Sequence, residues 1–325
     1  MLISNIQILR AFAALNVVFY HSIQASSDYH FESLIGRFFN NWGENGVDIF
    51  FVISGFIIVY IQHLNKRTAT DFFIQRIKRI VPIYWFCSFF IAIIYFFIPE
   101  IFNKLQFNLY HFLSSLFFLS NFFFNKQPLL TAGWTLEYEM FFYLLFALSL
   151  FFKSEKYSFF FICTSVLILA LFGTINLLFI EFLFGMLIAL IYIYSNFKIK
   201  NILSKYSYIF LILGIVLLCL PLFFFYNFSR YIQSGIPSSL ILLGCVFSKQ
   251  VTSRVYVFLG DASYSIYLTH LFVVRSIFKL GRNFLPTTNA EILIILTIII
   301  SLLFGLLIHL LVENRFRKII NSRHN

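Results

Sequence analysis

Two basic residues interrupt the first hydrophobic stretch of the chain, residues 6–23. Arg10 and His21 stand eleven positions apart in a run that is otherwise mainly apolar. On an α-helix, eleven residues make about three turns and rise roughly 16 Å, so both side chains lie on one face. An imidazole can act as a general base, and a guanidinium can bind phosphate through two hydrogen bonds. The alternative is that Arg10 is an interfacial anchor and His21 a hydrogen-bonded interior histidine.

The composition predicts the class of protein in which these residues lie. Hydrophobic residues make up 60% of the 325 residues, charged residues make up 11%, and the mean hydropathy is +0.88. A soluble domain could not cover that much apolar surface, and the 48 Phe and 18 Tyr suit lipid-facing and interfacial positions. We therefore predict an all-α, polytopic integral membrane protein that forms a single transmembrane domain over residues 1–325.

Cysteine spacing and net charge indicate which partners to expect. The four cysteines lie singly inside apolar runs, so we expect neither a disulfide framework nor a metal site. The net charge of +11 could suggest nucleic acid. Basic residues gather in the cytoplasmic loops of membrane proteins, however, so we expect no nucleic-acid partner.

Hydropathy predicts about ten membrane-spanning helices, and charge decides between ten and eleven. Residues 111–124 are short for a span and could instead be re-entrant or interfacial. With ten spans and a cytoplasmic N-terminus, seventeen of the 24 Lys and Arg residues lie inside; with eleven spans, only eleven do. The excess of basic residues expected inside favours ten spans, with both termini and Lys153 in the cytoplasm. The predicted spans are 6–24, 44–63, 81–99, 135–152, 157–173, 176–195, 207–226, 235–248, 257–275 and 291–311.

This topology assigns the polar residues of the predicted helices to two depths. Near the outer face lie His21, Asp48, Glu137, Glu139 and His270, and near the cytoplasm lie Arg10, Arg76 and Arg79. A carboxylate beside an imidazole can orient the ring and stabilise its protonated form, and a cationic inner level suits phosphates. Each residue also has a structural explanation. The arginines could follow from topology alone, Asp48 could cap a helix N-terminus, and His270 could bond a neighbouring helix.

Five motifs, in order along nearly the whole chain, resemble the membrane acyltransferase 3 family. They are the Arg10–His21 pair, GVDIFFVISGF at 46–56, Arg76-x-x-Arg79-Ile80-x-Pro82, WTLEYEMFFY at 134–143 and SYSIYLTH at 263–270. The opening SNIQILRAFAAL and the WTLEYEMFFY stretch are most similar to members that modify bacterial exopolysaccharide, capsule or O-antigen. The resemblance implies O-acyl transfer, commonly of acetyl from acetyl-CoA, to a carbohydrate hydroxyl at the bacterial inner membrane. One departure is Arg315, where members often have proline, so we expect the last helix to continue.

Carried over residue by residue, the resemblance implies three groups of site residues. We expect His21, Glu139 and Asp48 to be catalytic, Arg10, Arg76 and Arg79 to bind acyl-CoA, and Trp134, Ser54 and His270 to contact the substrate. In the mechanism that follows, the donor enters from the cytoplasm and His21, oriented by Glu139, deprotonates a hydroxyl of the acceptor, which is a carbohydrate, lipid-linked or free. Transfer through an acyl-histidine is a second route. Two other classes remain open: a flippase or transporter of lipid-linked sugars, and a membrane scaffold.

Overall fold

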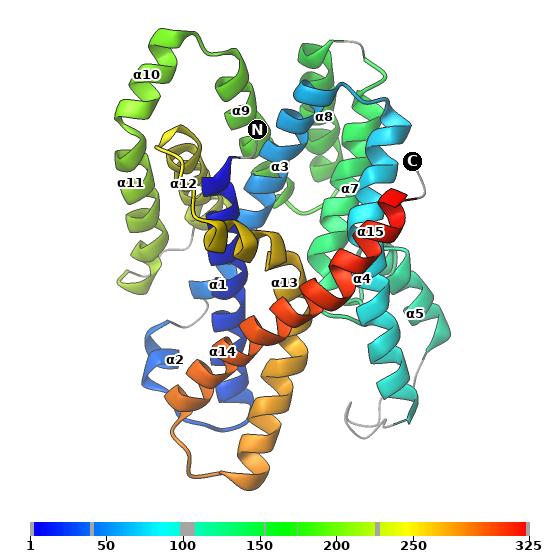
Figure 1. Cartoon of the computed structure of the whole chain (residues 1–325), viewed down its shortest axis with the longest axis vertical. Helices are drawn as coiled ribbons and strands as arrows, with labels where there is room; N and C mark the ends of the chain where they lie inside the picture. Colours follow the sequence, from blue (N-terminus) through cyan, green and yellow to red (C-terminus); the bar gives the residue numbers. More distant parts are fainter. Residues whose placement is uncertain are drawn as a thin grey trace. The chain divides into compact units, whose positions relative to one another are not determined.

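The computed structural model describes residues 3–39, 42–97, 108–152, 154–173, 175–224 and 228–322, and this part of the chain contains helices and no strand. Every predicted span coincides with a helical segment, so the all-α prediction is confirmed. The chain divides into two compact units (Figure 1). The first unit comprises Met1–Lys66 and Leu177–Leu307, and the second comprises Arg67–Asn176 and Ile308–Asn325. The predicted cytoplasmic position of Lys153 lies outside the described residues.

The first unit contains the long helices that carry His21, Asp48 and His270. Its elements are α1 (Ser4–Asp28), α2 (Leu34–Phe38), η1 (Trp42–Glu44), α3 (Asn45–Asn65), α9 (Phe179–Tyr194), α10 (Phe197–Lys205), α11 (Ser207–Cys219), η3 (Leu220–Leu222), η4 (Tyr231–Gly235), α12 (Ile236–Phe247), α13 (Arg254–Phe284) and α14 (Ala290–Ile308).

Glycines allow α3 and α9 to touch backbone to backbone. A Cβ atom on Gly55 would lie 2.0 Å from the carbonyl oxygen of Phe182, and one on Gly185 would lie 1.9 Å from that of Val52. Such small-residue crossings are how helices pack closely in membranes. Aromatic pairs lie on both sides of the crossing. Phe51 and Phe182 pair in the N-terminal halves of the two helices, and Tyr60 and Tyr192 pair in their C-terminal halves. The two helices therefore run parallel.

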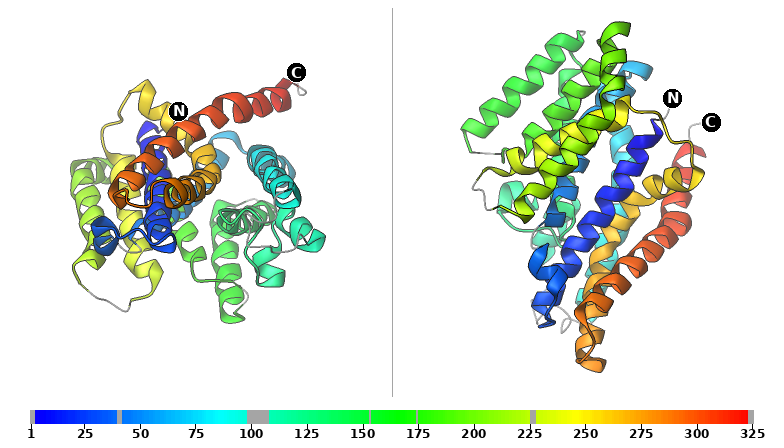
Figure 2. Two further views of the ribbon diagram at one scale, coloured as in Figure 1. Left: turned by 90° about the horizontal axis from the view of Figure 1, so that it is seen from below. Right: turned by 90° about the vertical axis from the view of Figure 1, so that its left-hand side faces the viewer.

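Helices α1 and α13 also run parallel, and α3 runs antiparallel to α1. Gln7 packs on Gly260 near the start of both α1 and α13, whereas His21 and His270 meet farther along. The two helices run side by side in Figure 1 and in the right-hand view of Figure 2. A Cβ atom on Gly46 in α3 would lie 2.4 Å from the carbonyl oxygen of Ala13 in α1. The start of α3 is thus brought against the middle of α1, close to His21.

The second unit carries the arginine and glutamate motifs. Its elements are α4 (Ala69–Phe97), α5 (Leu109–Leu116), α6 (Ser120–Phe124), α7 (Gly133–Ser149), α8 (Glu155–Leu171), η5 (His309–Glu313) and α15 (Asn314–Ser322). The ambiguous segment 111–124 forms two short helices, α5 and α6, separated by a break in which Phe118 has a φ of 60°. An eight-residue helix rises only about 12 Å, so this segment is not a continuous span.

Helix length supports a smaller number of spans than hydropathy predicts. Among the described residues, five helices are long and apolar enough to cross a membrane, and a sixth span results if the bent pair Phe197–Lys205 and Ser207–Leu222 counts as one. Helices α7, α8 and α9 have 16 or 17 residues. That length is below the roughly 20 residues that a full crossing needs. The protein is therefore a helical membrane protein with at least five apolar helices of spanning length.

Candidate functional site

Arg10 and His21 lie on one unbroken helix, α1, so their predicted separation of about three turns is present in the structure. Arg10 is buried, and its Nη1 donates to Oε1 of Gln7 at 2.9 Å. His21 is half-buried toward the other end of the helix. A charged group and an imidazole are thus held at two fixed levels of one helix.

The ring beside His21 is that of His270 from α13. The two ring centroids are 5.1 Å apart and the ring planes differ by 32°. His270 is fully buried, and its Nδ1 lies 2.5 Å from the carbonyl oxygen of Tyr267. A carbonyl only accepts, so Nδ1 carries the hydrogen and Nε2 keeps a lone pair. Among the described residues this Nε2 has no hydrogen-bond partner. The structure thus brings together two of the predicted site residues as a pair of potential proton acceptors.

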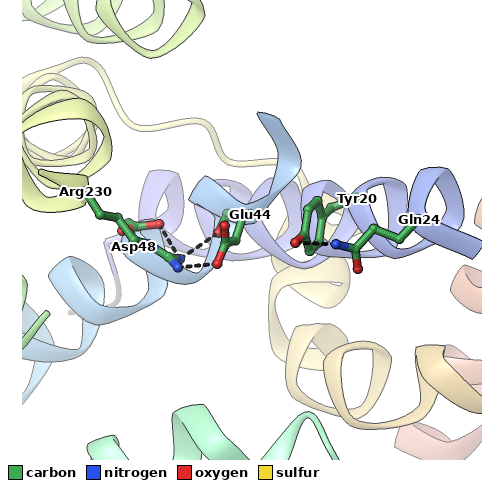
Figure 3. A network of polar contacts seen from close by, with 5 residues as sticks. All are labelled: Tyr20, Gln24, Glu44, Asp48 and Arg230. Atoms are coloured by element: carbon green, nitrogen blue, oxygen red, sulfur yellow. Dashed lines mark hydrogen bonds and ion pairs between the residues drawn. The ribbon is translucent and has the colours of Figure 1, made fainter. Parts of the chain in front are cut away.

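Asp48 is bound by an arginine that sequence reasoning did not select. Nε and Nη2 of Arg230 donate to the two carboxylate oxygens of Asp48 at 3.0 and 2.9 Å, and Nη1 donates to the carboxylate of Glu44 (Figure 3). Asp48 is fully buried, while Arg230 and Glu44 are partly exposed. Both oxygens of Asp48 are occupied, so this carboxylate holds Arg230 in place.

A second carboxylate, that of Glu181 at the start of α9, lies next to this ion pair. It is fully buried, and it interacts electrostatically with Asp48 and Arg230. Neither of its oxygens makes a well-formed hydrogen bond to the described residues. No group of three or more His, Cys, Asp or Glu side chains in the described part of the chain has the arrangement of a metal site.

In the second unit the two glutamates of the WTLEYEMFFY motif have different roles. Glu137 is buried, and its oxygens accept the backbone N–H groups of Ser120 and Asn121 at 3.0 and 2.8 Å. It therefore holds the start of α6. Glu139 is half-buried and accepts a hydrogen bond from the hydroxyl of Tyr143. That Glu139, and not Glu137, carries the chemistry stays a prediction.

Arg76 and Glu139 lie at one level, although the sequence predicted different depths for them. The guanidinium of Arg76 packs over the rings of Phe72 and Tyr143, 5.2 and 5.5 Å from their centroids, and Tyr143 bonds Glu139. The prediction treated Arg76 as preceding a span at 81–99. The helix instead begins at Ala69, so Arg76 lies inside it and is buried.

The remaining predicted residues are placed as follows. Arg79 on α4 is exposed, Trp134 packs edge-on against Tyr138 with centroids 5.7 Å apart, and Ser54 is buried in α3. The last helix continues through Arg315 as expected, since α15 extends to Ser322.

Glu313, at the end of η5, bonds both a histidine and an arginine of its own helical segment. Its carboxylate lies 2.7 Å from Nδ1 of buried His309 and 2.8 Å from Nη2 of Arg317. Replacement of the family's proline by Arg315 therefore leaves Glu313 bound within a continuous helical segment.

Sequence reasoning missed Glu44, Glu181 and Arg230. Glu181 had a recognisable signal, because it is an isolated carboxylate in the very apolar segment 179–194, and ionisable groups at such positions are usually functional. Arg230 had none, because it reads as an ordinary cation of a loop. Its partner Asp48 is 182 positions away in the chain.

The fold and these buried polar groups define an integral membrane protein with titratable side chains inside its helical core. Residues 3–308 match the acyltransferase domain family, and the chain belongs to it; the protein is an acyltransferase. It is 32% identical over 267 residues to the exopolysaccharide production protein ExoZ of Rhizobium meliloti (strain 1021), a match that covers 74% of this chain and 79% of ExoZ.

Two further relatives extend the comparison. The putative acetyltransferase ORF330 of Acidianus two-tailed virus is 30% identical over 285 residues, which cover 81% of each chain. The O-acetyltransferase OatA of Staphylococcus aureus (strain NCTC 8325 / PS 47) is 26% identical over 310 residues, which cover 81% of this chain and 49% of OatA. This chain therefore matches about half of OatA. No solved structure shows significant similarity to it.

Proposed function

We propose that the protein is a membrane-bound O-acyltransferase that moves an acyl group, acetyl in the simplest case, from cytoplasmic acyl-CoA to a hydroxyl of an exported carbohydrate. Membership of the acyltransferase family supports the reaction class, and the relatives ExoZ and OatA, named for exopolysaccharide production and O-acetyl transfer, support the carbohydrate and the acetyl group. The observation that carries the proposal is the placement of Arg10 and His21 about 16 Å apart on the single helix α1, with His270 beside His21.

His21 is the general base in this proposal. It takes the proton of the acceptor hydroxyl as the hydroxyl oxygen attacks the thioester carbonyl. The carbon–sulfur bond then breaks, the sugar keeps the acyl group, and the proton passes from His21 to the thiolate to give CoA. Glu139 is the proposed carboxylate partner of the base. Asp48 contributes indirectly by holding Arg230, and Trp134, Ser54 and His270 remain candidates for substrate contact.

Three arginines are the proposed binding groups for the phosphates of the donor. Arg10 lies at the opposite end of α1 from His21, and a pantetheine arm would bridge their separation. Arg76 and Arg79 supply two further cations from α4, and a guanidinium binds phosphate through paired hydrogen bonds. The family match extends through both compact units, and we propose that the two units act as one acyltransferase domain.

The parallel packing of α3 and α9 supports the ten-span topology with both termini in the cytoplasm. Two parallel helices cross the membrane in the same sense, so the chain between them, residues 66–178, crosses an odd number of times. In this proposal α4, α7 and α8 make three crossings, with α7 and α8, of 17 residues each, at the short end of the range for a span. A further crossing at 111–124 would make the pair antiparallel. Single cysteines introduced at Lys153 and Ser322 are expected to resist a membrane-impermeant maleimide in intact cells. Labelling of either would overturn the topology.

The test of the function is thioester turnover. Purified protein is incubated with acetyl-CoA and a series of glycosides, and free CoA and acetylated sugar are both quantified. Acyl transfer predicts equal amounts of the two products, and His21→Ala should abolish both. A flippase or transporter predicts no CoA release with any donor, and that result in folded protein would overturn the proposal.

A further inference from the structure

The polar side chains of Glu44, Tyr20 and Gln24 form a row (Figure 3), and the ring of Tyr20 lies beside that of His21 with the centroids 4.9 Å apart. Nε2 of Gln24 donates to the hydroxyl oxygen of Tyr20 at 2.6 Å, one helical turn away on α1. Tyr20 is in turn within electrostatic range of Glu44 on η1. Because the phenol oxygen accepts from Gln24, its own hydrogen can be donated elsewhere. The side chain of Gln24 also hydrogen-bonds that of His21, and an amide oxygen has a second lone pair with which to accept. All three side chains are partly exposed.

The packing of η1 against α1 determines where Glu44 lies. A Cβ atom on Gly43 would lie 2.5 Å from the carbonyl oxygen of Asn16 and 2.8 Å from Cβ of Tyr20. Only glycine permits this approach, and a hydrogen bond between the side chains of Asn16 and Asn45 joins α1 to the first residue of α3, directly after Glu44. Glu44 is therefore held one residue away from a backbone contact with the helix that carries His21.

An ion pair then fixes the carboxylate itself. Arg230 binds Glu44 through Nη1 and the backbone carbonyl of Glu44 through Nη2, and its other contacts are to buried Asp48. The bidentate pair of Arg230 with Asp48 has a defined geometry and fixes the guanidinium, whose Nη1 holds one carboxylate oxygen of Glu44. The row is thus organised before any ligand arrives, which lowers the entropic cost of binding.

Glu181 at the start of α9 extends the network behind the row. Its side chain is fully buried, and it interacts with Asp48 through a side-chain hydrogen bond that is not well formed and with Arg230 electrostatically. Buried carboxyl groups are ordinarily satisfied by such partners. Arg230, which holds Glu44, is therefore supported by two buried carboxyl groups.

We propose that Tyr20, Gln24 and Glu44 form the acceptor-binding subsite and take an uncharged, hydroxyl-rich sugar ring beside His21. This inference rests on the proposed acyl transfer and names its second substrate. Hydroxyls of the ring donate to the carboxylate of Glu44 and the amide oxygen of Gln24, and the phenol of Tyr20 donates to a ring oxygen. An acidic sugar is disfavoured because its carboxylate would face that of Glu44.

The test compares acceptors and variants under one assay. Acetyl transfer from acetyl-CoA to octyl β-D-glucoside and to octyl β-D-glucuronide is measured with wild-type protein, Glu44→Gln and Tyr20→Phe. The control is Glu32→Gln, because Glu32 forms an exposed ion pair with Arg37 outside the row. Affinity for acetyl-CoA is measured separately by equilibrium binding.

Loss of a charge-assisted hydrogen bond should raise the KM of Glu44→Gln for the glucoside about tenfold or more, and Tyr20→Phe should raise it severalfold. The acetyl-CoA affinity of both variants and the acceptor KM of Glu32→Gln should match wild type. Wild-type protein should have a higher kcat/KM for the glucoside than for the glucuronide. In Glu44→Gln the ratio of these two values should be smaller.

If the variants still transfer acetyl with an unchanged KM for the acceptor, the proposed acceptor subsite is wrong, whereas the proposed acyl transfer stands. If the variants bind acetyl-CoA more weakly, the row belongs to the donor site and the acceptor subsite is again wrong. Absence of transfer to both glycosides by folded wild-type protein would instead contradict the proposed function.

Discussion

Replacement of Asp48 by Asn tests whether the buried ion pair organises the outer part of the first unit. Asn keeps the size of the side chain, but its amide nitrogen would face the donors of Arg230, so one of the two bonds at 2.9 and 3.0 Å is lost and the charge is removed. Breaking a buried pair costs about 3–5 kcal/mol. The Arg230 side chain is 29% exposed and keeps its ion pair with Glu44. We therefore expect a loss of folding free energy at the lower end of that range, about 3 kcal/mol.

The assay is thermal unfolding in detergent, followed by the reactivity of the buried cysteines Cys87 and Cys245. At roughly 2 °C per kcal/mol for a chain of this size, the Tm should fall by about 6 °C. Glu32→Gln, which removes an exposed pair, should leave the Tm unchanged.

A double-mutant cycle with Arg230→Gln identifies the source of the loss. If the pair is the cause, the double variant is less destabilised than the sum of the two single variants. A Tm for Asp48→Asn equal to that of wild type, or strictly additive effects, would refute this account of the site.

Three further outcomes are expected. His21→Asn should lower the turnover number by about 10²–10⁴ while protein yield and acetyl-CoA affinity stay normal; near-normal turnover would transfer the role of base to His270. Arg10→Gln should weaken acetyl-CoA binding about tenfold or more in a calorimetric titration, whereas unchanged affinity would leave this arginine a purely structural role. Gly185→Ala should lower the Tm more than Gly173→Ala, because the new methyl group would lie 1.9 Å from the carbonyl oxygen of Val52. At Gly173 a methyl group has no atom within 4 Å, so the cost there is only the strain of an alanine at a φ of 66°, about 1–2 kcal/mol; equal Tm values for the two would contradict the described crossing.

The helices and the spacing of Arg10 and His21 could be predicted because both depend on local periodicity and hydropathy. Each predicted span coincides with a helical segment, and α1 is unbroken between the two residues. Helix ends were less predictable. Helix α4 begins twelve residues before the predicted span, because polar residues of its first three turns continue the helix, and this puts Arg76 at the level of Glu139.

Side-chain partners could not be predicted, because they depend on which helices meet. Asp48 and Arg230 are separated by 182 positions, and no local pattern relates them. The same holds for Glu137, which reads as a second candidate acid beside Glu139 until the break between α5 and α6 brings two backbone N–H groups to it. The sequence could therefore identify residue types suited to acyl transfer and, through the family resemblance, favour Glu139 over Glu137, whereas the groups that each carboxylate binds required the packing.

The backbone contact between α3 and α9 also restricts how the first unit can move. With Gly55 against Phe182 and Gly185 against Val52, neither helix can slide or rotate past the other without a steric clash between main-chain atoms. The α3–α9 pair therefore moves as one rigid piece, so the polar residues at its N-terminal end, Asp48 and Glu181, keep their separation throughout a reaction cycle. Any opening that admits a substrate to these residues then takes place at other helix contacts, and the substrate meets a network that is already in place.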